Sequence, residues 1–311
     1  MNILIVGTGV IGTIYGWALQ AAGLNITHLV RKGKGNNFQD GVTIDVLDER
    51  KGYKKYNKTT YPIKVIEMLD KNSSFDLVIV PTNYYQTEEA LKTVVPLCCN
   101  SFFYILTSNW TGTQLFDGTL RKHQYLLGYP DGGGTIRDNV YWANIGPEIH
   151  IAAPDEHNQQ GFELIEKAFA SATIKLDVQE NILHWLWVHN AGSAAIWAAT
   201  LKYRNIKKYL ADKALLKKSF LATRECLALC EKRGASSKGY PEISAFKMPM
   251  WLLIPMFKFN FKHNESMKRY TAHADNAPKE DVLINFRDIL ATAKELGFDM
   301  PNFKELEQFL K

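Results

Sequence analysis

A glycine-rich turn near the start of the chain constrains the fold more than any other feature of the sequence. Before the turn, residues 3–6 (Ile-Leu-Ile-Val) form a β-favouring run, which is typical of a parallel strand buried on both faces. The turn reads Gly7-Thr8-Gly9-Val10-Ile11-Gly12, and a helical pattern then extends through Ala22 to Gly23. A strand, this glycine spacing and a helix, in that order, predict a dinucleotide-binding unit.

Each glycine of the turn has a physical role in such a unit. Gly7 permits the tight bend, Gly9 lets the backbone approach a pyrophosphate, and Gly12 allows the helix to pack closely on the strand. The N–H groups at the start of the helix point toward the anion. We therefore predict that residues 7–12 bind the cofactor; the alternative is a glycine-rich turn without a ligand.

The second predicted strand, residues 26–30, ends at two basic residues. In a dinucleotide site an Asp or Glu at this place accepts hydrogen bonds from the adenosine ribose and favours NAD. This chain has Arg31 and Lys32 instead. A guanidinium can bind a 2′-phosphate through two parallel hydrogen bonds, whereas a carboxylate would repel it. The sequence therefore predicts NADP(H) rather than NAD(H).

Polar residues follow two further predicted strands, at residues 75–80 and 102–106. In an open parallel sheet, ligands bind outside the carboxyl ends of the strands. The polar residues at these ends are Thr82, Asn83, Gln86 and Asn109. We predict that they line the cofactor groove; the alternative is ordinary loop structure, because Asn is common in turns.

The pattern changes after residue 120. Residues 131–135 (Asp-Gly-Gly-Gly-Thr) are expected to form a flexible connection. Further predicted elements are paired strands at 140–144 and 148–152, a helix at 162–170, a strand at 174–178, and helices at 182–201, 211–233 and 279–296. Gly234 and Gly297 stand where a helix-terminating glycine belongs. The predicted domains are residues 1–179 and 180–311.

The helix predicted near residues 183–197 carries polar residues on one side only. Most of it is apolar all round, which indicates burial. At roughly 100° per residue, Leu186, His189, Asn190 and Ser193 share one arc. Buried polar groups need partners, so this arc either forms a network between helices or faces a cleft where substrate and nicotinamide would meet.

The composition excludes several classes of protein. Apolar residues make up 46% of the chain and charged residues 22%, which is ordinary for a globular protein. The net charge of +5 is too small to indicate a nucleic-acid partner. The four cysteines lack metal-binding spacing, so they are expected to be buried free thiols in a reducing, cytoplasmic compartment.

No targeting segment is visible, and the longest later apolar stretch, residues 248–257, contains two prolines. It is shorter than the ~20 residues that span a bilayer. We expect a buried helix pair broken at Pro255 and no membrane partner; membrane contact by this stretch is the alternative. A homodimer is the default expectation for the oligomeric state.

With these features the chain resembles the ketopantoate reductase (2-dehydropantoate 2-reductase) family over essentially its whole length. Besides the glycine turn, the similarity rests on Arg31, Thr82, Asn83, Gln86, Asn109 and the ending Gly297-Phe-Asp-Met-Pro301. It implies an α/β fold, with an N-terminal Rossmann-type doubly wound parallel sheet followed by an all-helical C-terminal substrate and dimerisation domain. It also implies NADPH-dependent reduction of 2-dehydropantoate to pantoate in pantothenate biosynthesis, with a lysine as proton donor.

The chain departs from the family pattern at that lysine. Matching the last residue of the family helix motif W-x-K-x-x-x-N to Asn190 puts Leu186 at the lysine position. Asn83 stands where the family has a cofactor-contacting lysine. The resemblance implies substrate contacts by Ser266 and by Asp281, which stands at a glutamate position. The cofactor half of the pattern is therefore kept, and the catalytic half is altered.

Reduction of a ketone generates an alkoxide, which needs a proton donor. His189 lies on the same arc as Leu186 and titrates near neutrality, so it is the candidate catalytic acid. Asn109 and Asn190 would orient the substrate carbonyl and carboxylate. The predicted substrate-binding residues are Asn190, Ser193, Ser266 and Asp281. Further candidates are His273 as donor, and Lys268 and Arg269 as carboxylate anchors.

The leading prediction is therefore an NADPH-dependent reductase of 2-dehydropantoate or another 2-oxo acid. One alternative is a reductase of a bulkier carbonyl compound, which a concentration of tryptophans would favour. Those tryptophans are Trp110, Trp185, Trp187 and Trp197. The other alternative is a non-catalytic NADP(H)-binding sensor, which would bind the cofactor without turnover.

Overall fold

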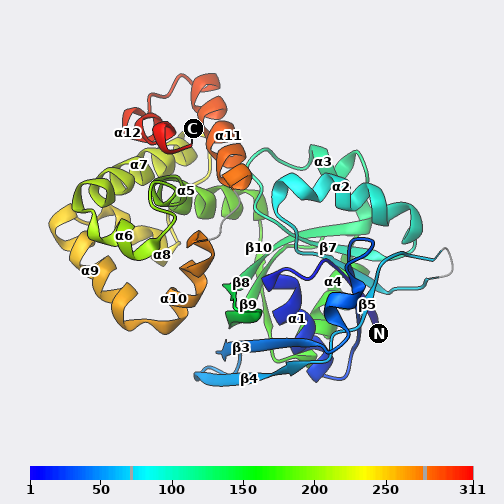
Figure 1. Ribbon diagram of the computed structural model, residues 1–311. Helices are drawn as coiled ribbons and strands as arrows, with labels where there is room; N and C mark the ends of the chain where they lie inside the picture. Colours follow the sequence, from blue (N-terminus) through cyan, green and yellow to red (C-terminus); the bar gives the residue numbers. More distant parts are fainter. Residues whose placement is uncertain (71–72, 276–278, 311) are drawn as a thin grey trace. The chain divides into compact units, whose positions relative to one another are not determined.

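The computed structural model describes residues 1–70, 73–275 and 279–310 (Figure 1). The chain forms two compact units. The first comprises Met1–Ser108 and Thr113–Ile182, and the second comprises Asn109–Gly112 and Leu183–Lys311. The short segment Asn109–Gly112 therefore leaves the first unit and packs with the second.

The first unit is built on one mixed sheet whose strands lie in the order β4-β3-β9-β8-β7-β6-β1-β2-β5, with β10 paired to β9. The strands are β1 (Asn2–Val6), β2 (Asn25–Leu29), β3 (Val42–Asp48), β4 (Lys55–Tyr61), β5 (Val65–Ile66), β6 (Leu77–Val80), β7 (Phe102–Leu106), β8 (Tyr125–Arg137), β9 (Val140–Ala152) and β10 (Lys175–Gln179). From β8 to β5 all neighbours are parallel, whereas β3–β4 and β8–β9 are antiparallel. The predicted parallel Rossmann-type sheet is confirmed, with an antiparallel extension.

The described residues of the first unit form four α-helices. They are α1 (Val10–Ala21), α2 (Tyr84–Val94), α3 (Gln114–Asp117) and α4 (Gln159–Ser171). The α1 and α4 helices contact each other and the sheet, and their aromatic rings join the core. The ring of Phe169 lies 5.9 Å from that of Tyr15 and 5.6 Å from that of Tyr104. Burial of this apolar layer stabilises the unit.

The glycine-rich segment at residues 131–135 is not a flexible connection, as the sequence predicts, but the middle of β8. Residues 140–144 and 148–152 likewise form one continuous strand, β9, which pairs with β8 rather than with itself. The reason is close backbone approach. A Cβ atom on Gly134 would lie 2.4 Å from the Trp142 carbonyl oxygen, so only glycine fits this part of the strand.

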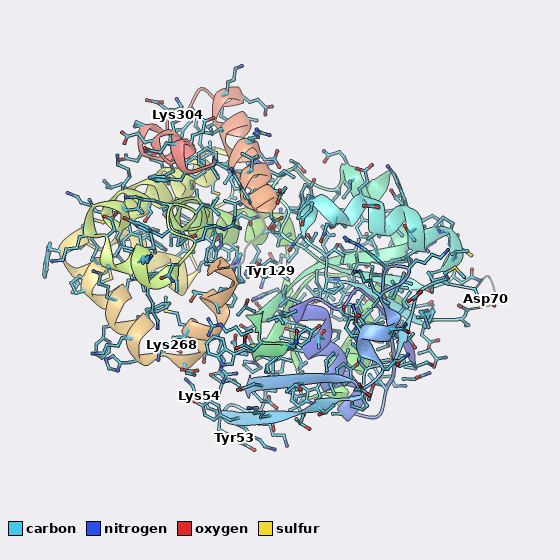
Figure 2. All side chains as sticks on the ribbon, viewed as in Figure 1. Tyr53, Lys54, Asp70, Tyr129, Lys268 and Lys304 are labelled. Atoms are coloured by element: carbon cyan, nitrogen blue, oxygen red, sulfur yellow. The ribbon has the colours of Figure 1, made fainter. Side chains whose placement is uncertain are left out.

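The hairpin of β3 and β4 has no counterpart among the sequence predictions. Its second strand is mostly exposed and mixes two lysines with tyrosine, threonine and asparagine, so it lacks the alternation of apolar and polar residues that marks a strand. Tyr53 and Lys54 lie between the two strands (Figure 2). Since β4 is an edge strand, its lysines disfavour pairing with further chains.

Among the described residues of the second unit, all regular secondary structure is helical, as predicted for the C-terminal domain. Its α-helices are α5 (Ile182–Thr200), α6 (Ile206–Ala211), α7 (Lys213–Lys232), α8 (Pro241–Ser244), α9 (Met250–His263), α10 (Glu265–Thr271), α11 (Lys279–Glu295) and α12 (Pro301–Glu305). Gly234 and Gly297 have φ angles of 93° and 58° after α7 and α11, so both are helix-terminating glycines as predicted. Phe286 and Phe303 stack at 4.2 Å in the core.

The prediction of a buried helix pair broken at Pro255 is wrong. The α9 helix continues through Pro255, and of its residues only Leu253 is fully buried. Pro255 cannot donate a hydrogen bond to the carbonyl of Trp251, a residue that is 76% exposed, so water can replace the missing donor there. In the part of the chain that the structure describes, no helix combines the length and apolar character needed to cross a bilayer.

The cysteines are free thiols, as predicted, but one of them is not buried. Cys98, Cys226 and Cys230 are buried, whereas Cys99 is exposed. Burial raises the pKa of the Cys230 thiol to about 12, so this thiol stays protonated and unreactive.

Candidate functional site

The predicted cofactor turn lies between β1 and α1 in the first unit. Gly7 has a φ of +93°, which side-chain-bearing residues rarely adopt. A Cβ atom on Gly12 would lie 3.0 Å from the Ile5 side chain and 3.2 Å from that of Pro81, which agrees with its predicted packing role. A Cβ atom on Gly9 would meet nothing within 4 Å, so the backbone there is open to a ligand. The turn therefore fits a pyrophosphate at the start of α1.

Buried side chains that the sequence reasoning missed hold this turn. His28 in β2 places Nδ1 2.9 Å from the Gly7 carbonyl oxygen and Nε2 3.1 Å from the Tyr61 hydroxyl. Because a carbonyl only accepts, Nδ1 carries the proton, and Nε2 accepts from Tyr61. Burial lowers the pKa of His28 to about 4, so the ring is neutral.

A second buried side chain supports the same turn from a strand on the other side of β1 in the sheet. The Tyr141 hydroxyl in β9 donates to the carbonyl oxygen of Thr8 over 3.0 Å. The only signal for such residues in the sequence is a polar side chain within an apolar strand, which does not identify its partner.

The end of β2 presents the predicted basic residues. Arg31 and Lys32 are exposed there. The nearby Glu67 carboxylate accepts hydrogen bonds from the Gly33 and Gly35 N–H groups, at 2.9 and 2.6 Å. These backbone donors lower the pKa of Glu67. Glu67 therefore holds the loop after Arg31 and Lys32 by binding the backbone N–H groups of that loop.

The order of the parallel strands brings three of the predicted sites to one edge of the sheet. Strands β6, β1 and β2 are neighbours and run parallel, so their carboxyl ends lie side by side. Thr82 follows β6, and its hydroxyl lies 2.9 Å from that of Thr87 in α2. Asn83 is exposed before α2 without capping it by its side chain, and Gln86 is half-buried. The glycine turn, Arg31 and Thr82 therefore lie at the same edge of the sheet, after the carboxyl ends of β1, β2 and β6.

Asn109, the remaining predicted cofactor residue, packs with the second unit. It is buried, and its amide closes its own loop. Its Nδ2 donates to the Gly112 carbonyl over 2.6 Å, and its Oδ1 accepts from the Gly112 N–H over 3.0 Å. The amide of Asn109 therefore builds the segment that carries Trp110.

Two of the tryptophans predicted for an aromatic pocket flank a cation instead. The Arg233 guanidinium lies 3.5 Å from the centre of the Trp187 ring and 5.1 Å from that of Trp110. It also donates to the Trp110 carbonyl over 2.8 Å. The Trp110 indole N–H donates to Thr292 over 2.9 Å. This cluster fastens the segment Asn109–Gly112 to the helices of the second unit.

The polar arc of α5 contains a histidine held between two aromatic residues. The His189 ring stacks on that of Trp185 at 4.9 Å and 11°. Its Nε2 lies 3.4 Å from the hydroxyl of Tyr270 in α10, a residue that the sequence reasoning did not select. The carbonyl of Tyr270 accepts from His273 Nδ1 over 2.8 Å, and the His273 ring contacts that of Trp197 at 4.4 Å. Two predicted donors, His189 and His273, therefore meet at Tyr270.

The other residues of the arc differ in their surroundings. Leu186 is buried and apolar. Ser193 donates to carbonyls of its own helix, 3.3 Å away at both His189 and Asn190. The Asn190 side chain is buried, and among the described residues its Nδ2 has no hydrogen-bond partner. An unsatisfied buried amide is costly, so Asn190 is a donor available to a ligand.

The residues singled out by the family resemblance lie on α10 and α11. The Ser266 hydroxyl is buried and has no partner among the described residues. Burial raises the pKa of Asp281 to about 6. The proposed carboxylate anchors both approach Glu265, Lys268 at 3.5 Å and Arg269 at 3.4 Å. Arg269 is buried, so only Lys268 presents a charge at the surface (Figure 2).

No group of His, Cys, Asp and Glu side chains in the described residues has the arrangement of a metal site.

Comparison with known proteins identifies relatives by sequence over part of the chain. Residues 3–114 match the family described as Ketopantoate reductase PanE/ApbA. A 2-dehydropantoate 2-reductase from Pyrococcus horikoshii is 27% identical over 208 residues. This match covers 63% of the chain and 62% of the relative, which is less than two thirds of the relative's length.

Solved structures share the fold over the whole chain. A 2-dehydropantoate 2-reductase from Geobacter metallireducens has a TM-score of 0.74 at 15% identity, covering 100% of this chain and 99% of the other. D-mandelate dehydrogenase with NADH and anilino(oxo)acetate has a TM-score of 0.73 at 12% identity, covering 100% and 97%. Part of the chain is thus similar in sequence to the ketopantoate reductase family, and the whole chain shares its fold with a solved 2-dehydropantoate 2-reductase.

Proposed function

We propose that this chain is a reductase that uses NADPH to convert a 2-oxo acid into the corresponding 2-hydroxy acid. The observation that carries the proposal is the glycine turn beside Arg31 and Lys32 on neighbouring parallel strands. The open backbone at Gly9 suits the pyrophosphate, and the two exposed cations suit further phosphate.

The preference for NADPH follows from charge at the end of β2. Arg31 can bind the 2′-phosphate of the adenosine ribose through paired hydrogen bonds, and Lys32 adds a second positive charge. Glu67 accepts from two backbone N–H groups, which directs its carboxylate oxygens to the loop. Thr82, Asn83 and Gln86 would complete the cofactor groove.

When bound, NADPH supplies a hydride to the carbonyl carbon of the substrate. The carbonyl oxygen then needs a proton, and we assign its donation to His189 in place of the family lysine. Tyr270 holds the imidazole through Nε2, and the Trp185 ring fixes its plane. Protonation by a positioned group contributes on the order of 10²- to 10⁴-fold to the rate.

The substrate would be oriented by polar groups of the second unit. Asn190 and Ser266 have side-chain atoms that are buried and unpartnered among the described residues, so both can bind a carbonyl or carboxylate. Asp281, with its raised pKa, can stay protonated in weakly acidic solution and donate to the same group. Ser193 and Asn109 are the other predicted contacts.

A bulkier carbonyl substrate is the second candidate. One observation favours it, since a fold neighbour is D-mandelate dehydrogenase with anilino(oxo)acetate, an aromatic 2-oxo acid analogue. The third candidate is a sensor that binds NADP(H) without chemistry. Buried Leu186, at the position of the family lysine, is the residue that favours it.

The test is NADPH oxidation, followed by absorbance, with 2-dehydropantoate, benzoylformate and short aliphatic 2-oxo acids. Turnover with 2-dehydropantoate supports a place in pantothenate biosynthesis, and turnover with benzoylformate alone supports the bulkier substrate. Binding of NADPH without turnover on any compound supports the sensor. Failure to bind NADPH contradicts all three candidates.

Two further parts of the proposal concern assembly and location. A homodimer is proposed on general grounds and is tested by the mass in solution. The free thiols, three of them buried, support a reducing compartment such as the cytoplasm.

A further inference from the structure

The α9 helix exposes large apolar side chains that the proposed reductase function does not use. Trp251 is 76% exposed, Phe259 63% and Leu252 40%. These are large values for such residues, and they occur together on one helix. In Figure 1, α9 lies along the edge of the helical unit.

The opposite side of α9 packs against the core of the second unit, and these contacts determine which side of the helix is exposed. Leu253 is buried, and the Phe257 ring meets that of Phe220 at 5.1 Å. Arg224 in α7 also donates to the carbonyls of Phe246 and Met248, which anchors the segment before the helix. These contacts leave the side of α9 that carries Trp251 and Phe259 exposed to solvent.

That exposed face combines aromatic and cationic side chains. Trp251, Pro255 and Phe259 follow one another at four-residue spacing and so lie in one row. Lys258 lies at the edge of this row, and Lys262 lies within the same arc, one turn beyond Phe259. An apolar row with a tryptophan and flanking lysines is the pattern of a helix that lies in a membrane interface.

The charge of the segment selects an anionic partner. Residues 243–264 contain Lys247, Lys258, Lys262 and His263 but no Asp or Glu. In a two-fold contact between two copies, this face would meet itself and place lysine near lysine without a carboxylate of the segment between them. An anionic lipid surface instead accepts both the apolar row and the cations.

We propose that α9 is an interfacial helix that binds the protein reversibly to membranes containing anionic phospholipid. Its 14 residues lie in the plane of the headgroups rather than across the bilayer. The row of Trp251, Pro255 and Phe259 enters the headgroup region, and Lys258 and Lys262 face the lipid phosphates. This inference does not depend on the identity of the reductase substrate.

The experiment measures co-sedimentation of the full-length protein with two kinds of vesicle. One kind is phosphatidylcholine alone, and the other is phosphatidylcholine mixed with phosphatidylglycerol. We expect binding to the mixed vesicles only, weakened by added salt because the attraction is partly electrostatic. Double substitution Trp251→Ala with Phe259→Ala is expected to weaken binding by roughly tenfold or more, since the inserted apolar area is lost.

Matched variants locate the effect. Lys258→Glu with Lys262→Glu is expected to abolish the preference for the mixed vesicles. Tyr53→Ala with Tyr56→Ala removes two aromatic residues that are 57% and 62% exposed on the lysine-rich hairpin, and it is expected to leave binding unchanged. Both α9 residues are exposed, so circular dichroism should show all variants folded.

Three results would overturn the proposal. The first is absence of sedimentation with either vesicle. The second is binding that the hairpin variant weakens and the α9 variants do not. The third is a dimer in solution that the Trp251 and Phe259 substitutions convert to monomer without vesicle binding, which would make α9 a contact between copies. A bound acidic protein in place of lipid would likewise appear as no vesicle binding.

Discussion

The imidazole Nδ1 of His28 lies 2.9 Å from the carbonyl oxygen of Gly7, so a buried histidine holds the turn that is proposed to bind the cofactor. The contact joins the end of β1 to the neighbouring parallel strand β2. Tyr61 on β4 completes it from the other ring nitrogen. The neutral His28 side chain therefore holds the turn together with the Tyr141 hydroxyl, which donates to the Thr8 carbonyl.

The first prediction concerns the pH dependence of folding. The pKa of His28 falls from 6.5 to about 4 on folding because burial disfavours the charged ring. Between these values the unfolded chain binds more protons than the folded one, so stability is full above pH 6.5 and falls as the pH is lowered toward 4. The expected loss is about 3 kcal/mol, measured by denaturant unfolding across this range.

The control for this prediction is His28→Asn, which keeps a donor near Gly7 but does not titrate. The variant is expected to be less stable at neutral pH, with a shallower loss of stability between pH 6.5 and 4. An unchanged slope would mean that other groups cause the acid sensitivity.

The second prediction concerns cofactor choice. Arg31→Ala is expected to raise the Kd for NADPH by roughly 10- to 100-fold and to leave the Kd for NADH nearly unchanged, because only NADPH carries the 2′-phosphate. Titration calorimetry measures both constants. Lys92→Ala, which removes an exposed lysine paired with Glu88, is the charge-matched control. Equal weakening of both cofactors would show that Arg31 acts on the loop rather than on the phosphate.

The third prediction concerns the proton donor. His189→Ala is expected to lower kcat by on the order of 10²- to 10⁴-fold without changing the Kd for NADPH. Tyr270→Phe removes the hydroxyl 3.4 Å from His189 Nε2, so it should shift the pH profile of kcat and lower the rate less. His184→Ala, on the other side of α5, serves as control. Full turnover by His189→Ala would remove this residue from the mechanism.

The fourth prediction concerns the segment Asn109–Gly112. Trp110 is 2% exposed and packs on Arg233, whereas Trp251 is 76% exposed. Trp110→Ala should destabilise the helical unit by about 3–5 kcal/mol, and the same change at Trp251 should have little effect on stability. Scanning calorimetry compares the two. Similar unfolding temperatures for the two variants would show that the cluster of Trp110 and Arg233 does not hold the segment Asn109–Gly112.

Local sequence patterns predicted the first strand, the glycine turn, the first helix and the ends of later helices. The strand before Gly7, the helix after Gly12 and the terminating Gly234 each depend on backbone geometry that few residues permit. The residues that meet these requirements stand in the sequence directly beside the strand or helix that they begin or end. They are therefore visible without knowledge of the rest of the chain.

The features that the sequence did not reveal depend on partners far along the chain. Gly134 is indistinguishable from a loop glycine until the Trp142 carbonyl is known to lie against it. His28 is an unremarkable strand residue until Gly7 and Tyr61 surround it. The exposure of Trp251 depends on which side of α9 packs against α7, which the apolar composition of both sides conceals.

The pairing of β3 with β9 has a consequence for how the protein is made. Thr43 on β3 aligns with Val140 on β9, so roughly a hundred residues must leave the ribosome before β3 acquires its inner neighbour. Until then β3 and its lysine-rich hairpin partner can form only an isolated ribbon, which is marginally stable in water. Only after synthesis has passed Ala152 can β3 pair with β9 and join the rest of the sheet.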